Sequence, residues 1–159
     1  MSVSDDEAFE AFWRTHSQSV TRAAAAFAGD VQDGMEIAQE AFARAYQHWR
    51  KVSQMDRPDA WVHRVAANLA ISKRRRRRPS LAGPEPTTAA PATPDDELMK
   101  ALRSLTPAQR AVVCLRYYLD WSVEEVADAL GKAPGTVRAL THQGMERLRA
   151  DLTKEPQDE

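Results

Sequence analysis

Six consecutive cations, Lys73 and Arg74 to Arg78, form the densest charge cluster of the chain. Clustered arginines bind phosphate and release the counterions of nucleic acid, although a solvated charge run or a localisation signal would look alike. Upstream, Trp61, Arg64 and Asn68 share one helical stripe at spacing i, i+3, i+7. If exposed, this stripe can stack on unpaired bases and hydrogen-bond their edges. Burial of Trp61 in the core fits the pattern equally well.

A second candidate for nucleic-acid recognition lies between Ser122 and Leu152. Ser122 and Glu125 form a capping box, Gly131 can end the helix that follows, and Pro134 can start the next one. This order is typical of a helix-turn-helix, whose second helix enters the major groove of DNA. A plain helical hairpin with a solvated face is the alternative. The expected base-reading residues are Thr136, Arg138, Ala139, His142, Gln143 and Arg147.

The polar side chains between Gln32 and Trp49 differ from the two basic candidate surfaces above, because most of them are acidic or amide groups. They comprise Asp33, Glu36, Gln39 and Glu40, with Arg44 one turn later. Phosphate would repel such a face. Either a basic protein partner or solvent is therefore expected to meet it.

Enzymatic and metal chemistry find little support in the sequence. The four histidines, His16, His48, His63 and His142, have no histidine partner at i+4, and no phosphate loop, nucleophile elbow or HExxH motif is present. A single cysteine, Cys114, excludes an internal disulfide and suits a reducing cytoplasm. No apolar run approaches the roughly 20 residues of a membrane span, and the acidic first ten residues do not resemble a signal peptide. We expect a cytoplasmic protein with no catalytic residues, no metal, no cofactor and no membrane insertion.

The elements that must position these groups have helical periodicity. Apolar residues recur at helical spacing from Phe9 to Phe27, and a polar stretch at Thr15–Ser19 is expected to break this helix before Gly29 ends it. A loop at Lys51–Arg57 leads to a helix that begins at Pro58. We expect four helices in this half. The inward residues are predicted to be Ala38, Ala41, Phe42, Ala45, Tyr46 and Trp49 in the helix from about Gln32, and Val62, Val65 and Leu69 in the helix from Pro58.

A Pro-rich segment, residues 79–96, divides the 159-residue chain and contains five of its nine prolines and no Lys or Arg. At about 3.1 Å per residue it could span on the order of 50 Å. After it, Leu98, Leu102 and Leu105 mark a short helix, and Thr106 with Gln109 forms a capping box for a helix to about Leu119. The sequence therefore predicts an all-α fold with two small helical domains, residues 1–78 and 97–159, joined by a Pro-rich acidic linker.

Four motifs stand in this order along the chain: DGMEIAQEAFARAY from Asp33, PDAWVHRVAANLA from Pro58, LRSLTPAQR from Leu102 and GTVR from Gly135. With the helical parts that contain them, they resemble the extracytoplasmic-function group of the sigma-70 family. The resemblance implies that residues 8–78 are the family's region 2 and residues 97–152 its region 4. It implies a non-enzymatic subunit that binds core RNA polymerase, at the β′ clamp coiled coil and the β flap, and directs promoter-specific transcription initiation. An anti-sigma factor is a further implied partner.

The resemblance also implies a role for each group of residues. Core polymerase would be bound by Asp33, Glu36, Ile37, Gln39, Glu40, Phe42 and Arg44. The −10 element would be melted and captured by Ser53, Gln54, Met55 and Asp56 in the loop and by Trp61, Arg64, Asn68, Lys73, Arg74, Arg75 and Arg76 in the next helix. The helix-turn-helix residues would read the −35 element as duplex. A stand-alone helix-turn-helix regulator is the main alternative, and a metal-dependent nuclease that cleaves DNA is the third reading.

Overall fold

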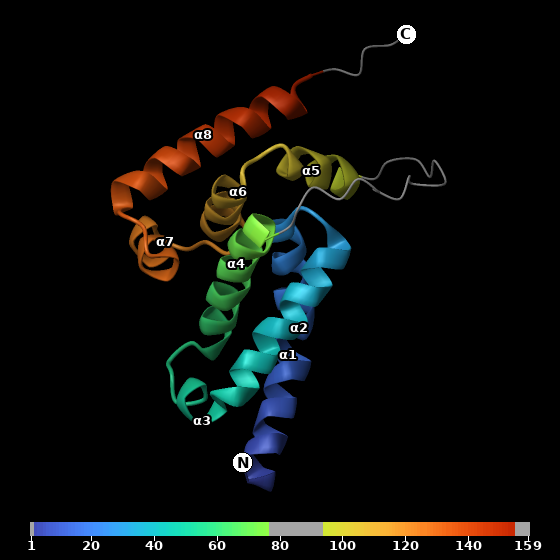
Figure 1. Cartoon of the computed structure of the whole chain (residues 1–159), viewed down its shortest axis with the longest axis vertical. Coiled ribbons are helices and arrows are strands. Elements are labelled where there is room, and N and C mark those ends of the chain that lie inside the picture. The colour runs from blue at the N-terminus through green and yellow to red at the C-terminus, as the bar shows by residue number, and fades with distance from the viewer. Residues whose placement is uncertain (1, 77–93, 155–159) are drawn as a thin grey trace, which may run out of the picture.

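A computed structural model of the chain describes residues 2–76 and 94–154, apart from the side chains of residues 73–76 and 94–95 (Figure 1). Within these residues every regular element is a helix, so the predicted all-α class is confirmed. None of the described helices is long and apolar enough to cross a membrane. Most of the predicted linker, residues 79–96, lies outside the described residues.

The N-terminal half contains α1 (Val3–Ala28), α2 (Val31–Gln47), α3 (Trp49–Val52) and α4 (Pro58–Arg76). The predicted break at residues 15–19 is wrong, because α1 runs through it without interruption. Side-chain hydroxyls in and after this stretch bond to the backbone of their own helix: Thr15 Oγ1 donates to the Ala11 carbonyl at 2.9 Å, and Thr21 Oγ1 donates to the Ser17 carbonyl at 2.7 Å. A polar run without glycine or proline therefore stays helical, and α1 ends at Gly29 with a left-handed φ of 71°.

Small residues bring α1, α2 and α4 close together around the core of this half. A Cβ atom at Gly34 of α2 would lie 2.4 Å from the Cα of Ala25 in α1, so only glycine allows this approach. In α4, Val62, Ala66 and Ala67 are fully buried, whereas the predicted inward residues Val65 and Leu69 are only partly buried. Alanines therefore supply more of the α4 contact surface than the predicted larger side chains do.

The C-terminal half contains α5 (Pro94–Arg103), α6 (Pro107–Val113), the π-helical turn η1 (Cys114–Tyr118), α7 (Val123–Leu130) and α8 (Pro134–Leu152). Both predicted capping boxes are confirmed, Thr106 with Gln109 at α6 and Ser122 with Glu125 at α7. Gly131 ends α7 with φ 62°, so α7, a three-residue turn and α8 form the predicted helix-turn-helix. In α8, Val137, Gly144 and Leu148 are buried and Leu140 is partly buried.

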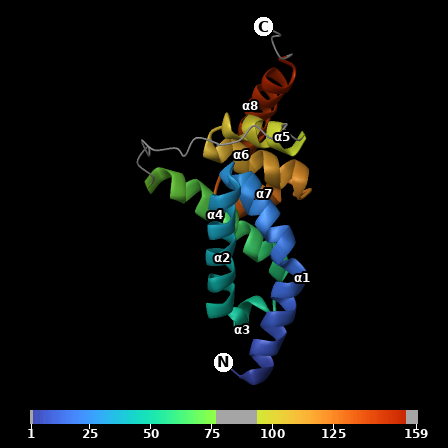
Figure 2. The same ribbon diagram turned by 90° about the vertical axis from the view of Figure 1, so that its right-hand side faces the viewer.

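The two halves pack against each other at the end of the α1–α2–α4 bundle opposite the N-terminus (Figures 1 and 2). Helix α6 contacts both α1 and α4, and α7 contacts α4. Buried residues of both halves, such as Phe27 and Leu105, belong to one continuous hydrophobic core. The sequence did not indicate this contact between the halves.

Candidate nucleic-acid interface

The outward face of α2 presents the acidic and amide residues predicted to meet a protein partner. Glu36, Gln39, Glu40 and Arg44 are exposed, and Asp33 is half-buried at the first turn. Arg44 Nε lies 3.0 Å from Glu40 Oε1, an exposed i, i+4 pair that contributes little to stability. These four exposed side chains and Asp33 are available as a group to an approaching surface.

Two residues predicted for the same surface, Ile37 and Phe42, lie instead in the core, with exposed fractions of 3% and 5%. On a helix, the residue next to an outward side chain can point partly inward, and Ile37 beside Glu36 belongs to the hydrophobic core. Phe42 packs edge-on against Phe12 of α1, with 6.1 Å between ring centroids, and Ile37 also lines the groove between α2 and α4. Both side chains thus support α2 beneath the acidic face.

A groove of about 500 Å³ runs between α2 and α4 and joins two groups that lie far apart in sequence. Glu36, Glu40 and Arg44 line it from α2, and Asn68 and Ser72 line it from α4. The acidic face of α2 therefore adjoins the face of α4 that carries the predicted base-contacting amide. This adjacency could not be read from the sequence.

The loop predicted to capture a base is shorter than expected, because Lys51 and Val52 belong to α3 and the irregular segment starts at Ser53. Ser53, Gln54 and Asp56 are exposed and Met55 is partly buried. Backbone turns hold the start of the loop: Gln54 N donates to the Lys51 carbonyl at 3.3 Å, and Met55 N donates to the Val52 carbonyl at 3.1 Å. The loop thus presents exposed polar side chains, and two backbone hydrogen bonds hold its first residues.

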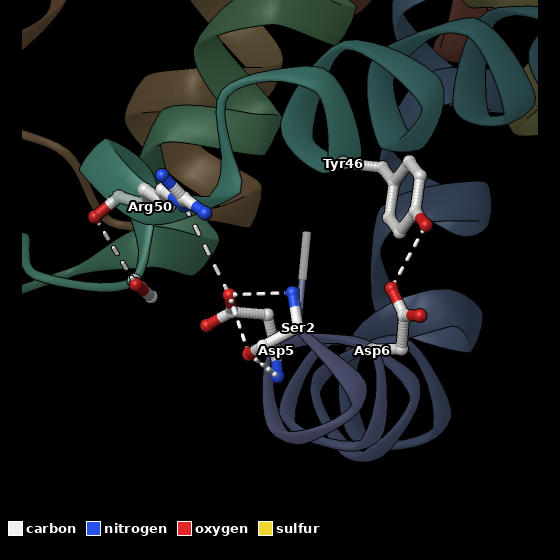
Figure 3. A network of polar contacts seen from close by, with 6 residues as sticks. Ser2, Asp5, Asp6, Tyr46 and Arg50 are labelled. Carbon is white, nitrogen blue, oxygen red and sulfur yellow. Dashed lines mark hydrogen bonds and ion pairs between the residues drawn. The ribbon is translucent and has the colours of Figure 1, made fainter.

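A polar network ties the start of α1 to the helices that precede this loop (Figure 3). Tyr46 was predicted to face inward but is 39% exposed, and its hydroxyl donates to Asp6 Oδ1 at 2.8 Å. This hydrogen bond to a carboxylate raises the pKa of Tyr46. Arg50, at 4.0 Å from Asp5 Oδ2, adds a weak exposed contact. The first turn of α1 therefore contacts the α2–α3 junction.

The start of α4 holds the stripe predicted to meet unpaired bases. Trp61 is partly buried against the core, with its ring edge-on to His48 at 6.3 Å between centroids, whereas Arg64 is exposed. Trp61 was predicted either to lie in the core or to be exposed for stacking on bases. In the structure its ring packs against the core and also remains partly accessible. The backbone of Lys73, Arg74, Arg75 and Arg76 continues α4, but their side chains lie outside the described residues.

The helix-turn-helix exposes all six predicted −35 residues, Thr136, Arg138, Ala139, His142, Gln143 and Arg147, along one half of α8. Three of them already have polar partners. Arg138 lies 3.8 Å from Glu124, His142 lies 3.2 Å from Glu146, and Gln143 accepts a 3.4 Å hydrogen bond from Gln109. Exposed pairs of this kind are worth about 0–1 kcal/mol, so a ligand can displace them at small cost.

The sequence reasoning missed two further arginines, Arg116 in η1 and Arg149 near the end of α8 itself. Arg116 and Arg149 line a groove of about 250 Å³ together with Arg138 and His142. Arg116 donates from Nη1 to the Trp121 carbonyl at 2.7 Å, while its buried Nε has no hydrogen-bond partner within the described residues. In the sequence, Arg116 is the lone cation in an apolar and aromatic stretch. That isolation is the feature that could have identified it as a candidate functional residue.

The described part of the chain contains no cluster of three or more His, Cys, Asp or Glu side chains that could bind a metal ion. Cys114 is buried, and burial raises the pKa of its thiol to about 12.

Comparison with known proteins identifies the family. A model described as sigma-70 region 2 matches residues 12–79, and one described as sigma-70, region 4 matches residues 95–148. The chain is 34% identical over 154 residues to the RNA polymerase sigma-E factor of Streptomyces coelicolor, covering 91% of this chain and 85% of that protein. The chain belongs to the extracytoplasmic-function group of the sigma-70 family. This sigma factor is thus related to transcription initiation factors rather than to enzymes.

Other relatives share most of the length of this sigma factor. The ECF RNA polymerase sigma factor SigL of Mycobacterium tuberculosis is 33% identical, over 89% of this chain and 87% of that protein. SigW of Bacillus subtilis is 28% identical, over 93% and 90%. Among solved structures, the sigma factor RpoE of Bartonella quintana in complex with the anti-sigma factor NepR has a similar fold, with a TM-score of 0.74 and 17% identity over 94% of this chain and 99% of that one.

Proposed function

We propose that this sigma factor binds core RNA polymerase through the outward face of α2 and directs promoter-specific initiation by reading −35 duplex and opening the −10 element. One observation carries the proposal: the α2–α4 groove places Glu36, Glu40 and Arg44 beside Asn68. A protein that held the polymerase on α2 would bring the enzyme directly alongside the helix that meets the promoter.

The α2 face fits a cationic protein surface, with the β′ clamp coiled coil as the proposed partner. Glu36, Gln39 and Glu40 project from successive turns, and the buried Ile37 and Phe42 fix the helix beneath them. Because the supporting side chains are packed in the core, the α2 backbone is already fixed and needs little further ordering on binding. In this proposal Ile37 and Phe42 act as supports, and the β flap is a second contact, with region 4.

The −10 element is proposed to be opened by the loop from Ser53 to Asp56 and by α4. Flipping a base out of the stack costs a few kcal/mol, which stacking and hydrogen bonding to the captured base can offset. The exposed loop side chains can surround an extruded base, and the accessible ring of Trp61 and the exposed Arg64 can contact the next nucleotides. Sequence reading and strand opening would then occur in one step.

The −35 element is proposed to be read by α8 as duplex, through Arg138, Ala139, His142 and Gln143 in the major groove with Thr136 and Arg147 beside them. Arg138 can read guanine and Gln143 adenine, once their present partners are displaced. The proposed division is region 2 over residues 1–78, a linker over 79–96 and region 4 over 97–159. Such a protein acts in the cytoplasm, where the polymerase is.

An anti-sigma factor is a further proposed partner. The support is that a solved structure of similar fold is a sigma factor bound to an anti-sigma factor. Such a partner would act by covering the α2 face or the groove beside it, and so would compete with the polymerase.

A charge-reversal pull-down with core polymerase tests the proposal. Glu36→Lys combined with Glu40→Lys places two cations on the α2 face, and we expect binding to core polymerase to be lost. The matched control is Glu7→Lys with Glu10→Lys, which makes the same charge change on exposed residues of α1. Equal binding by both double variants would contradict the proposed interface, and absence of binding by the unmodified protein would contradict the function.

A further inference from the structure

Residues 46–52, which comprise the end of α2 and the whole of α3, lead directly into the loop from Ser53 to Asp56; we call them the α2–α3 junction. Trp49 connects this junction to both of its neighbours. Its ring packs against Phe9 of α1, and its carbonyl accepts a 2.8 Å hydrogen bond from the backbone nitrogen of Ser53, the first residue of the loop. A shift of the junction relative to α1 would therefore move the start of the loop.

Aromatic rings join α1 to the junction. The Trp49 ring is edge-on to Phe9, with 5.3 Å between centroids, and its centroid lies 5.1 Å from that of Phe12. Tyr46 is edge-on to the same Phe9 ring at 5.1 Å. Edge-to-face pairs at these separations are favourable beyond the burial of area, and Trp49 is only 5% exposed. This packing holds the junction against α1 from the apolar side.

Two acidic residues of α1 contact the same junction from the polar side (Figure 3). Asp6 accepts the 2.8 Å hydrogen bond from the Tyr46 hydroxyl, and Asp5 Oδ2 lies 4.0 Å from Arg50 Nε. Asp5 is fixed in turn by Ser2, whose hydroxyl donates to it at 2.9 Å and whose backbone nitrogen donates at 3.2 Å; these hydrogen bonds lower the pKa of Asp5. Of the two contacts with the junction, the one between Asp6 and Tyr46 has the better geometry.

The backbone of the loop is weakly held by its own hydrogen bonds. The amide nitrogens of Gln54 and Met55 each donate to the carbonyl three residues earlier, at 3.3 Å and 3.1 Å, which is towards or beyond the long end of the usual range. Ser53 Oγ adds a 3.4 Å hydrogen bond to the carbonyl of Arg50, a residue of the junction. The conformation of the loop therefore depends on where the junction lies.

We propose that Asp6 and Tyr46 are positioning residues for base capture: by fixing the α2–α3 junction on α1, they hold the loop from Ser53 to Asp56 in the conformation that receives a flipped −10 base. The inference rests on the proposed −10 function. In this arrangement neither residue contacts DNA, and both act through the loop. A loop that is ordered before DNA arrives has a lower entropic cost of capture, so less of the interaction with the correct base is offset by ordering of the loop.

Two single variants remove the hydrogen bond between these residues. Tyr46→Phe keeps the ring against Phe9 and deletes only the hydroxyl group, and Asp6→Ala deletes the acceptor. Glu7→Ala is the matched control, because it removes one negative charge from the neighbouring exposed residue of the same helix, as Asp6→Ala does. The double variant, Asp6→Ala with Tyr46→Phe, completes the cycle.

The base selectivity of the holoenzyme measures capture. The probe is a pool of single-stranded DNA whose −10 segment is randomised. Sequencing the DNA bound by the sigma factor with core polymerase gives the ratio of the preferred base to the other bases at each position. We expect Asp6→Ala and Tyr46→Phe each to lower this ratio about two- to fivefold at the captured position. The double variant should lose no more than either single variant, and Glu7→Ala should match the unmodified protein.

Amide hydrogen exchange of the free chain, followed by nuclear magnetic resonance, shows whether the two residues act through the loop. The amides of Gln54 and Met55 should exchange faster in both single variants than in Glu7→Ala, while the amides of α8 stay unchanged. Lower selectivity without faster exchange in the loop would show that Asp6 or Tyr46 contacts DNA directly, and it would overturn the positioning role.

Two outcomes separate this proposal from the function on which it rests. The unmodified holoenzyme could select bases in the −10 segment while both single variants select them equally well, or while Glu7→Ala loses as much selectivity as they do. Either result overturns the positioning role and leaves the −10 function standing. If the unmodified holoenzyme binds the pool with no base preference, the −10 function fails and the positioning role fails with it.

Discussion

Replacing Gly34 by alanine tests the close approach of α2 to α1, on which the presentation of the acidic face depends. A Cβ at this position would lie 2.4 Å from the Cα and 2.5 Å from the backbone nitrogen of Ala25. Backbone atoms cannot move to another rotamer, so the two helices must separate. Overpacking costs about 1–3 kcal/mol, and a rigid backbone neighbour places this case near the upper end.

The change also has a favourable part, because alanine is preferred over glycine in a helix interior by about 1 kcal/mol. We therefore expect Gly34→Ala to lower the free energy of unfolding by about 1–2 kcal/mol in total. For a chain of this size the melting temperature should fall by about 2–8 °C. Thermal unfolding followed by circular dichroism measures the shift.

Gly135→Ala is the matched control, because that glycine is also helical and has no atom within 4 Å of an added Cβ. It should leave the melting temperature unchanged or raise it slightly, by up to about 1 kcal/mol of added stability. If Gly34→Ala were as stable as Gly135→Ala, the packing argument for α1 and α2 would be refuted. The position of the acidic face would then need another explanation.

Two further predictions concern single side chains. Burial lowers the pKa of His63, whose Nδ1–H donates to the Asp59 carbonyl at 2.9 Å. Below about pH 6.5 the unfolded chain takes up a proton that the folded chain resists, so the free energy of unfolding should fall as the pH drops; denaturant titrations should show a flatter profile for His63→Gln. Arg138→Ala should weaken −35 duplex binding by about 1–3 kcal/mol and relax specificity at one base pair, measured by fluorescence anisotropy on promoter variants; an equal loss on every sequence would show a phosphate contact instead.

Local signals in the sequence predicted much of the C-terminal half. The capping boxes at Thr106 and Ser122 and the left-handed Gly131 are confirmed, because caps and tight turns depend on residues within one helical turn of each other. The π-helical turn after Val113 was not predicted, since no sequence signal separates it from a continuing α-helix.

The wrong predictions in the N-terminal half arose where tertiary contacts outweighed local sequence patterns. Polar residues at positions 15–19 looked like a helix break, but the Thr15 hydroxyl bonds back to the helix and the packing of α1 on α2 and α4 decides the outcome. Tyr46 looked apolar from its spacing, yet its hydroxyl finds Asp6 forty residues away. A hydrogen bond between residues so far apart in sequence depends on how α1 and α2 pack, and hydrophobic periodicity within one helix does not predict it.

The sequence by itself determined the helical class, the helix-turn-helix and the family, because these depend on local propensity and on ordered motifs. It also located the candidate surfaces on α2, α4 and α8. Only the tertiary structure decided that Ile37 and Phe42 support the acidic face from below, that this face shares a groove with Asn68, and that Arg110 and Asn68 cap helices of the opposite half. These facts depend on the relative placement of packed helices. The sequence around a donor residue does not show which distant helix end will supply its acceptor carbonyl.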